Sequence, residues 1–150
     1  MAVSETAINF VKENEGFRSK AYWDVSRYSI GYGTSSFKGE EITPEEAEER
    51  LKEELIKAEK ALVDYFGEKY TSLNDSQKAA LLDFRYNVGS LAGCPKLKRA
   101  IMEGNLSQVP VEMSDVLVKR SRFSSEEEYQ KVLKGLKNRR NAEIKMWNTK

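Results

Sequence analysis

Residues 17–42 constrain the fold most, because they interrupt a chain whose other segments have helical periodicity. This segment is rich in aromatic residues, β-branched residues and glycine, as in AYWDVSRYSIGYGTSSFKGEEI. That composition predicts two or three short antiparallel strands, with turns near Val25–Arg27 and Lys38–Gly39. We therefore expect an α+β fold with a small antiparallel sheet near the N-terminus.

Helical patterns flank this segment on both sides. Residues 4–14 predict a short helix with Ser4 as its N-cap, ending before Gly16. Thr43, followed by Pro and two Glu residues, has the pattern of a capped helix start, and the apolar spacing after it continues to about Gly67. Later helices are predicted from Asn74 or Asp75 to Gly89, from Pro95 to about Gly104, over 106–118, and from Ser124 or Ser125 toward Trp147.

These elements predict one domain over residues 1–150. Its N-terminal lobe, about residues 15–65, holds the sheet. The long helix joins it to a mostly helical C-terminal lobe of about residues 66–150, which also receives the first helix. A cleft between two such lobes is a natural place for an extended polymer.

The absence of histidine narrows the possible chemistry. The chain has no His and one Cys, Cys94. Ser-His-Asp and Cys-His catalysis and His/Cys zinc sites are therefore excluded in their usual forms, and we expect neither a metal nor a cofactor. Carboxylates become the leading candidates for acid–base chemistry, ahead of Lys and Tyr.

Charge is distributed unevenly along the chain. Residues 1–84 carry 11 Lys+Arg and 17 Asp+Glu, whereas residues 85–150 carry 14 and 7. The basic half suggests affinity for nucleic acid or bacterial wall, although a solvated helical surface explains it equally well. No apolar run approaches the roughly 18 residues of a membrane span, and the opening residues lack the pattern of a secretory signal. We expect cytoplasmic synthesis and no stable membrane association.

Two carboxylates near the N-terminus are candidates for catalysis. Glu15 ends the first predicted helix, and Asp24 lies nine residues later, in the first predicted strand or its turn. A helix end and a facing hairpin can bring such groups together across a cleft. Glycoside hydrolysis needs this pair: a protonated acid for the leaving oxygen, and an ionised carboxylate that activates water or acts as nucleophile. In a chain with 24 acidic residues, two surface groups are the alternative explanation.

The segments 15–24 (EGFRSKAYWD) and 29–34 (SIGYGT) resemble the bacteriophage lysozymes, or endolysins, of glycoside hydrolase family 24. The resemblance continues at 42–47 (ITPEEA), 80–89 (ALLDFRYNVG) and 135–140 (GLKNRR). The family signature is Glu, eight residues, Asp, five residues, Thr. Here only four residues separate Asp24 from Ser29, and the hydroxyl residue is Ser.

The resemblance implies a lysozyme-like fold and a catalytic assignment. By the family pattern, Glu15 is the general acid, Asp24 orients or activates the attacking water, and Ser29 takes the place of the water-positioning threonine. The implied reaction is hydrolysis of the β-1,4 bond between N-acetylmuramic acid and N-acetylglucosamine in peptidoglycan. This reaction would release phage progeny by host-cell lysis.

The resemblance also implies substrate-binding residues and a partner. Tyr86 falls in a wall of the sugar cleft, with a core position as the alternative. Asn138 and Arg139 could bind acyl, lactyl or peptide carboxylate groups, and an arginine there could pair with Glu15; a solvated helix surface is the alternative. The implied partner is the peptidoglycan strand, reached from the host cytoplasm through a separate membrane hole. We expect the protein to be a monomer.

Three other functions fit parts of the sequence. A lytic transglycosylase needs an acid such as Glu15 but no second carboxylate, so Asp24 argues against it. The shortened spacing from Asp24 to Ser29 is the one feature that suggests a wall-binding or structural protein that does not turn over substrate. Nucleic-acid binding would use the basic half, but its basic residues are not interleaved with stacking aromatics, so we expect no nucleic-acid partner.

Overall fold

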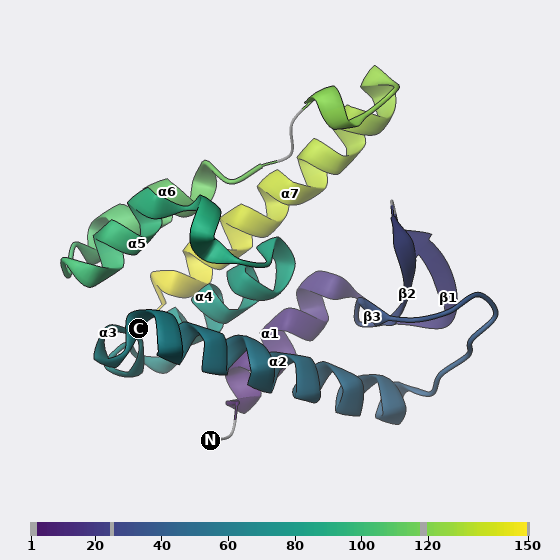
Figure 1. The fold of residues 1–150 in the computed structure, drawn as a ribbon, viewed down its shortest axis with the longest axis horizontal. Helices are drawn as coiled ribbons and strands as arrows, with labels where there is room; N and C mark the ends of the chain where they lie inside the picture. Colours follow the sequence, from purple (N-terminus) through teal and green to yellow (C-terminus); the bar gives the residue numbers. More distant parts are fainter. Residues whose placement is uncertain (1–2, 25, 118–119, 150) are drawn as a thin grey trace.

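A computed structural model describes residues 3–24, 26–117 and 120–149, and it has the predicted α+β architecture: a small antiparallel sheet attached to a mostly helical body (Figure 1). The helices and strands are α1 (Glu5–Glu15), β1 (Arg18–Asp24), β2 (Arg27–Gly31), β3 (Thr34–Ser35), α2 (Pro44–Phe66), α3 (Glu68–Thr71), α4 (Asp75–Val88), α5 (Pro95–Met102), α6 (Val109–Ser114) and α7 (Glu126–Trp147). Single 3-10 turns are η1 (Leu91–Gly93), η2 (Leu106–Gln108) and η3 (Arg120–Arg122).

The ends of α1 and α2 confirm the predicted capping. Ser4 Oγ accepts a hydrogen bond from the Ala7 amide at 3.2 Å, and Gly16, with a φ of 70°, ends α1. Thr43 Oγ1 accepts from the Glu46 amide at 3.2 Å and opens α2. These caps satisfy amides that a helix leaves without partners. They also place Glu15 at the last position of α1.

The sheet of described residues has the antiparallel order β1-β2-β3. Asp24 faces Arg27 where β1 returns into β2, close to the predicted turn, and Val25 lies outside the described residues. A second turn, at 32–33, was not predicted. It follows Gly31, where an added Cβ would lie 2.8 Å from Ala47 Cβ, so glycine lets the sheet approach α2 closely.

Helix α4 lies at the centre and packs against α1, α2 and α7 (Figure 1). Its middle is buried all round, because Ala79–Phe84 are all buried, Asp83 among them. A helix enclosed by three others has no solvated side in this stretch. A charged residue within it must find its partner inside the protein.

The other predicted helices match the structure in part. Asn74, Pro95 and Ser125 open helices where expected. The segment predicted as one helix over 106–118 forms η2 and α6 instead, and residue 118 lies outside the described residues. The short α3 was not predicted. In the part of the chain that the structure describes, no helix has the length and apolar character needed to cross a bilayer.

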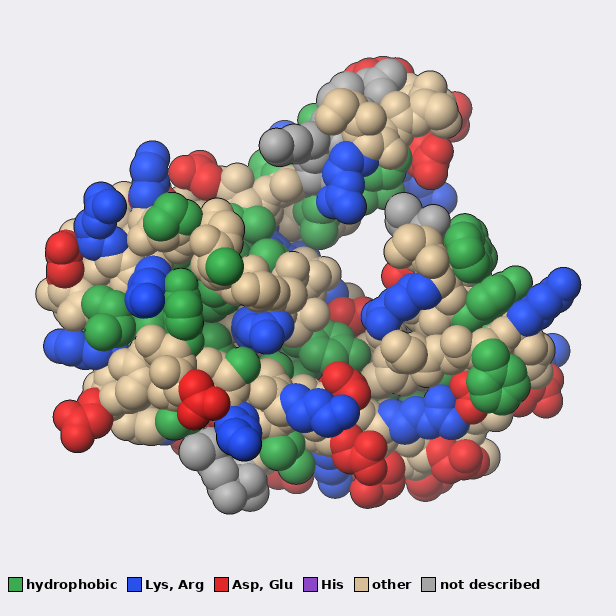
Figure 2. Space-filling view, in the orientation of Figure 1, with side chains coloured by type: hydrophobic (Ala, Val, Ile, Leu, Met, Phe, Trp, Pro, Cys, Tyr) green, Lys and Arg blue, Asp and Glu red, His purple; other side chains and the backbone are tan. Residues whose placement is uncertain are grey.

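Helix α2 extends from the sheet to the far end of the helical body, while the long α7 passes above α4 and α1 in the same view (Figure 1). Figure 2 shows a deep hollow in the surface of the molecule between the sheet and the N-terminal part of α7. The fold therefore presents a concave surface beside the predicted catalytic carboxylates.

Candidate active site

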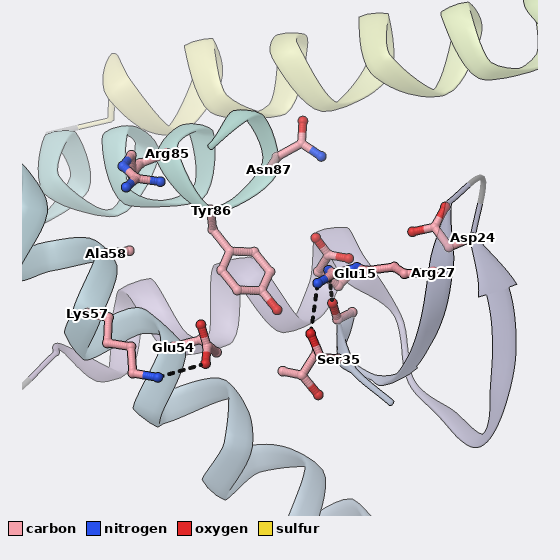
Figure 3. A pocket seen from close by; sticks show the side chains of 12 residues that line it. Glu15, Asp24, Arg27, Ser35, Glu54, Lys57, Ala58, Arg85, Tyr86 and Asn87 are labelled. Carbon is pink, nitrogen blue, oxygen red and sulfur yellow. Dashed lines mark hydrogen bonds and ion pairs between the residues drawn. The ribbon is translucent and has the colours of Figure 1, made fainter. Parts of the chain in front are cut away.

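Glu15 lines a cleft with a volume of about 320 Å³, bordered by the sheet and by helices α1, α2 and α4. In Figure 3, Glu15 lies between Tyr86, which projects from α4, and Asp24, at the end of β1. Asp24 is exposed, whereas the side chain of Glu15 is only 16% exposed. The cleft therefore holds two carboxyl groups with different environments.

The environment of Glu15 favours its protonated form. Burial raises the pKa of this carboxyl, and the nearby carboxylates of Asp83 and Asp24 act in the same direction. Arg139 opposes them, because its Nη1 donates a hydrogen bond to Glu15 Oε2 at 2.7 Å. The pKa remains above the ordinary glutamate value, so Glu15 keeps a proton to higher pH than an exposed glutamate.

Arg139 is held by Asp83. Its Nε and Nη2 donate to the two carboxylate oxygens of Asp83 at 3.1 Å and 2.8 Å. This two-point contact fixes the plane of the guanidinium and directs Nη1 toward Glu15. The sequence suggested that an arginine near residue 139 could pair with Glu15, and the structure shows that this arginine is Arg139. Asp83 was missed in the sequence, although an aspartate inside the apolar run Ala79–Phe84 was a signal for it.

A second buried layer lies behind Arg139. Arg140 Nε is 3.0 Å from Glu143 Oε1, and Arg140 also donates to Asn87 Oδ1. Burial raises the pKa of Glu143, and the nearby Asp83 adds to the rise. Together with Glu15, the cluster joins three carboxyl groups to two guanidinium groups. The pKa values of two of these carboxyls, Glu15 and Glu143, are raised, so both keep a proton to higher pH than an exposed glutamate does.

The turn at 32–33 forms a wall of the cleft against Glu15. A Cβ added to Gly33 would lie 2.7 Å from Glu15 Oε1, and Gly33 has a φ of 91°. Tyr86 Oη donates to the Tyr32 carbonyl at 2.8 Å, so α4 contacts the same turn. Glu15 is therefore enclosed between Arg139 on one carboxylate oxygen and Gly33 on the other.

We expect Gly33→Ala to lower any glycan-cleaving activity by at least about tenfold, because the new methyl displaces the carboxyl of Glu15, the predicted general acid. Steady-state rates on purified peptidoglycan measure the effect. Gly39→Ala is the matched control: its φ of 87° imposes similar backbone strain, but no atom lies within 4 Å of the added Cβ. Equal losses in the two variants would show that backbone strain, and not contact with Glu15, limits activity.

The other predicted residues occupy three different places. Ser29 is fully buried on β2, and its Oγ makes no hydrogen bond with the described residues. Tyr86 lines the cleft with its hydroxyl already engaged. Asn138 is exposed and lines a neighbouring hollow of about 390 Å³ that it shares with Asn87 and Arg139. The structure therefore brings Glu15, Asp24 and Tyr86 into one cleft, and leaves Ser29 behind its surface.

Arg27 and Ser35, which the sequence did not single out, also line the cleft beside Gly33. Arg27, the first residue of β2, donates from Nη1 to Ser35 Oγ at 2.9 Å and from Nη2 to the Gly33 carbonyl at 3.1 Å. Nothing in the local sequence pattern distinguishes Arg27 from a surface arginine.

Within the described residues, no group of three His, Cys, Asp or Glu side chains is placed to hold a metal ion.

The sequence matches the phage lysozyme family over residues 12–143. The chain belongs to this family. An endolysin of Bacillus phage PZA is 34% identical over 96 residues, which are 59% of this chain and 36% of that endolysin. The chain thus spans about a third of the length of that curated relative.

Solved structures of phage-lysozyme-like proteins match the whole fold. The muramidase domain of SpmX from Asticaccaulis excentricus superposes with a TM-score of 0.82 at 25% identity, covering 99% of this chain and 98% of that one. An endolysin from Escherichia coli O157:H7 phage FAHEc1 gives 0.75 at 26% identity, covering 99% and 94%. These likenesses agree with the predicted lysozyme-like architecture.

Proposed function

We propose that this member of the phage lysozyme family is a peptidoglycan hydrolase that cleaves the β-1,4 bond between N-acetylmuramic acid and N-acetylglucosamine. One observation carries the proposal: a largely buried glutamate with a raised pKa and an exposed aspartate line the same cleft. Glycoside hydrolysis requires this division between a protonated acid and an ionised partner. The muramidase and endolysins that the chain resembles support the choice of substrate.

Glu15 would act as the general acid. It donates its proton to the glycosidic oxygen as the bond to the leaving sugar breaks, and Arg139 then stabilises the carboxylate that remains. Asp24, at the exposed rim, would orient or activate the water that attacks the anomeric carbon. The leaving oxygen takes the proton from Glu15, and water gives its hydroxyl to the anomeric carbon and its remaining proton to Asp24 or to solvent. Glu15 regains a proton from solvent, and the products are two sugar chains, one with a reducing muramic end.

Further residues are proposed to contact the substrate. The half-buried ring of Tyr86 forms part of the cleft wall and offers a flat surface to a sugar. Asn138 and the exposed side of Arg139 line the adjoining hollow, where amide and guanidinium groups suit acyl, lactyl or peptide carboxylate groups. We propose that the partner of this protein is a glycan strand of the wall and that the protein binds it as a monomer.

The proposed role in lysis places the protein in the host cytoplasm until a separate membrane hole gives access to the wall. The endolysin of Bacillus phage PZA, with its similar sequence, supports this role. Release of progeny would follow when enough glycan bonds are cut for the wall to fail under turgor.

Product analysis tests the reaction. The protein is incubated with purified peptidoglycan, and mass spectrometry identifies the ends of the released glycans. We expect reducing muramic ends that borohydride converts to muramitol. Anhydro ends would mean that the protein is a lytic transglycosylase, and wall binding without soluble products would mean that it does not turn over substrate.

By the family pattern, we propose that Ser29 helps to position the attacking water from behind the cleft wall, where its buried hydroxyl has no hydrogen-bond partner among the described residues. We expect Ser29→Ala to lower kcat by about tenfold, which is less than the loss of either carboxylate. Ser29→Thr, which restores the family's residue, should keep activity. If Ser29→Ala turns over as fast as the wild type, another group positions the water.

A further inference from the structure

The turn that encloses Glu15 has little stiffness of its own. Its glycines, Gly31 and Gly33, both adopt positive φ, and strand β3 after it has only two residues. Within the turn, the Gly33 amide donates to the Ile30 carbonyl at 3.1 Å. Glycine gives the chain wide conformational freedom, so contacts from elsewhere must hold such a segment in one position.

Two side chains supply those contacts from opposite sides. Tyr86, from α4, donates to the carbonyl of Tyr32 at 2.8 Å. Arg27, from β2, donates to the carbonyl of the next residue, Gly33, at 3.1 Å, and to Ser35 Oγ at 2.9 Å. Figure 3 shows the Arg27 side chain extended along the cleft wall beside Glu15, with both of its bonds drawn.

The planar guanidinium of Arg27 can bond two acceptors at once in fixed geometry, which a lysine ammonium cannot reproduce. The bonds join the turn to β3 and to the start of β2. Since a Cβ at Gly33 would already overlap Glu15 Oε1, a small displacement of this turn changes the space around the acid. We infer that Arg27 is a positioning residue for the proposed reaction: it holds the Tyr32–Gly33 turn against Glu15 and so keeps the catalytic carboxyl enclosed.

This inference rests on the proposed role of Glu15 but makes its own prediction. If the turn moves away, water reaches the carboxyl, the effect of burial is reduced, and the pKa of Glu15 falls toward the ordinary value. The alkaline limb of the activity profile then moves to lower pH, because the acid loses its proton earlier.

The groups that face Glu15 remain in place when Arg27 becomes lysine. They are Tyr22 and Asp24 from β1, Asp83 and Tyr86 from α4, and Arg139, with Glu143 behind it, from α7. Arg27→Lys also keeps the positive charge on β2. A change in the titration of Glu15 in this variant therefore reports the loss of the two-point contact and not a change in local charge.

The test compares Arg27→Lys with the wild type in two measurements. Carbon-13 NMR of carboxyl-labelled glutamate gives the titration of Glu15, assigned by the signal missing from Glu15→Gln. Steady-state kinetics on purified peptidoglycan give kcat and KM across pH. We expect a lower pKa for Glu15, a kcat about tenfold lower, and a KM close to that of the wild type.

Two further variants complete the design. Ser35→Ala removes one of the two acceptors and should shift both measurements in the same direction but less; it decides the question if Arg27→Lys does not fold. Arg99→Lys, at an exposed arginine on α5, is the control. Both are checked by thermal unfolding before the kinetics.

The outcomes separate cleanly. An unchanged Glu15 titration with unchanged kcat overturns the inference, and a raised KM with unchanged kcat would show that Arg27 binds substrate instead. If the wild type produces no muramic ends while the Glu15 titration still shifts in Arg27→Lys, the proposed function fails and the positioning role of Arg27 stands.

Discussion

Glu15→Gln is expected to lose activity on peptidoglycan by about a thousandfold, the range of effect of a missing general acid. Gln has the shape of the protonated carboxyl and can still accept a hydrogen bond from Arg139, but it has no proton to transfer. Rates of muramic-end release, measured with enough enzyme to detect the residual turnover, give the loss. A variant with more than a tenth of wild-type activity would remove Glu15 from the acid role.

The pH dependence of the wild type follows from the same residue. The pKa of Glu15 is raised, so the acid form persists above the pH at which an exposed glutamate would ionise. With Glu15 as the proposed general acid, we expect activity to fall as pH rises through that pKa. The stability contribution of a group with a raised folded-state pKa is present below its unfolded pKa and is lost as pH rises through the folded value. Glu15→Gln should therefore unfold no more easily than the wild type at alkaline pH, which separates loss of chemistry from loss of fold.

Asp83→Ala is expected to lower the free energy of unfolding by about 3–5 kcal/mol, because it leaves Arg139 buried without its two-point partner. Asp83 is fully buried and accepts two of the hydrogen bonds of Arg139. The substitution also leaves a cavity in the most enclosed part of α4. Urea unfolding at neutral pH, followed by circular dichroism, measures the change.

Glu143→Gln is the matched control inside the same cluster. Burial and the nearby Asp83 raise the pKa of Glu143, so the amide replaces a carboxyl that already favours its neutral form. We expect a destabilisation of less than about 1 kcal/mol, within the ordinary cost of one neutral hydrogen bond. If Glu143→Gln proves as costly as Asp83→Ala, Glu143 is an ionised partner of the arginines and not a neutral carboxyl.

The sequence alone determined the elements whose signals are local. Caps at Ser4 and Thr43 and a change of periodicity at residues 17–42 depend on neighbouring residues in the chain, so they could be predicted. The same holds for the placement of Glu15 at a helix end. The family motif also predicted that Glu15 and Asp24 belong to one site, because the eight-residue spacing between them matches the signature.

Tertiary structure decided what depends on contacts between distant residues. Arg139 joins Glu15 to Asp83 across 124 and 56 positions of sequence, and residues Ala79–Phe84 of α4 are buried on all sides only because three helices enclose them. The contact of Gly33 with Glu15 likewise requires the sheet to fold back onto the end of α1. The sequence thus determined that a carboxyl side chain, that of Glu15, stands at the end of a helix. Its burial, its raised pKa and its enclosure by Arg139 and Gly33 were decided by packing, since desolvation and ion pairing arise only when the elements come together.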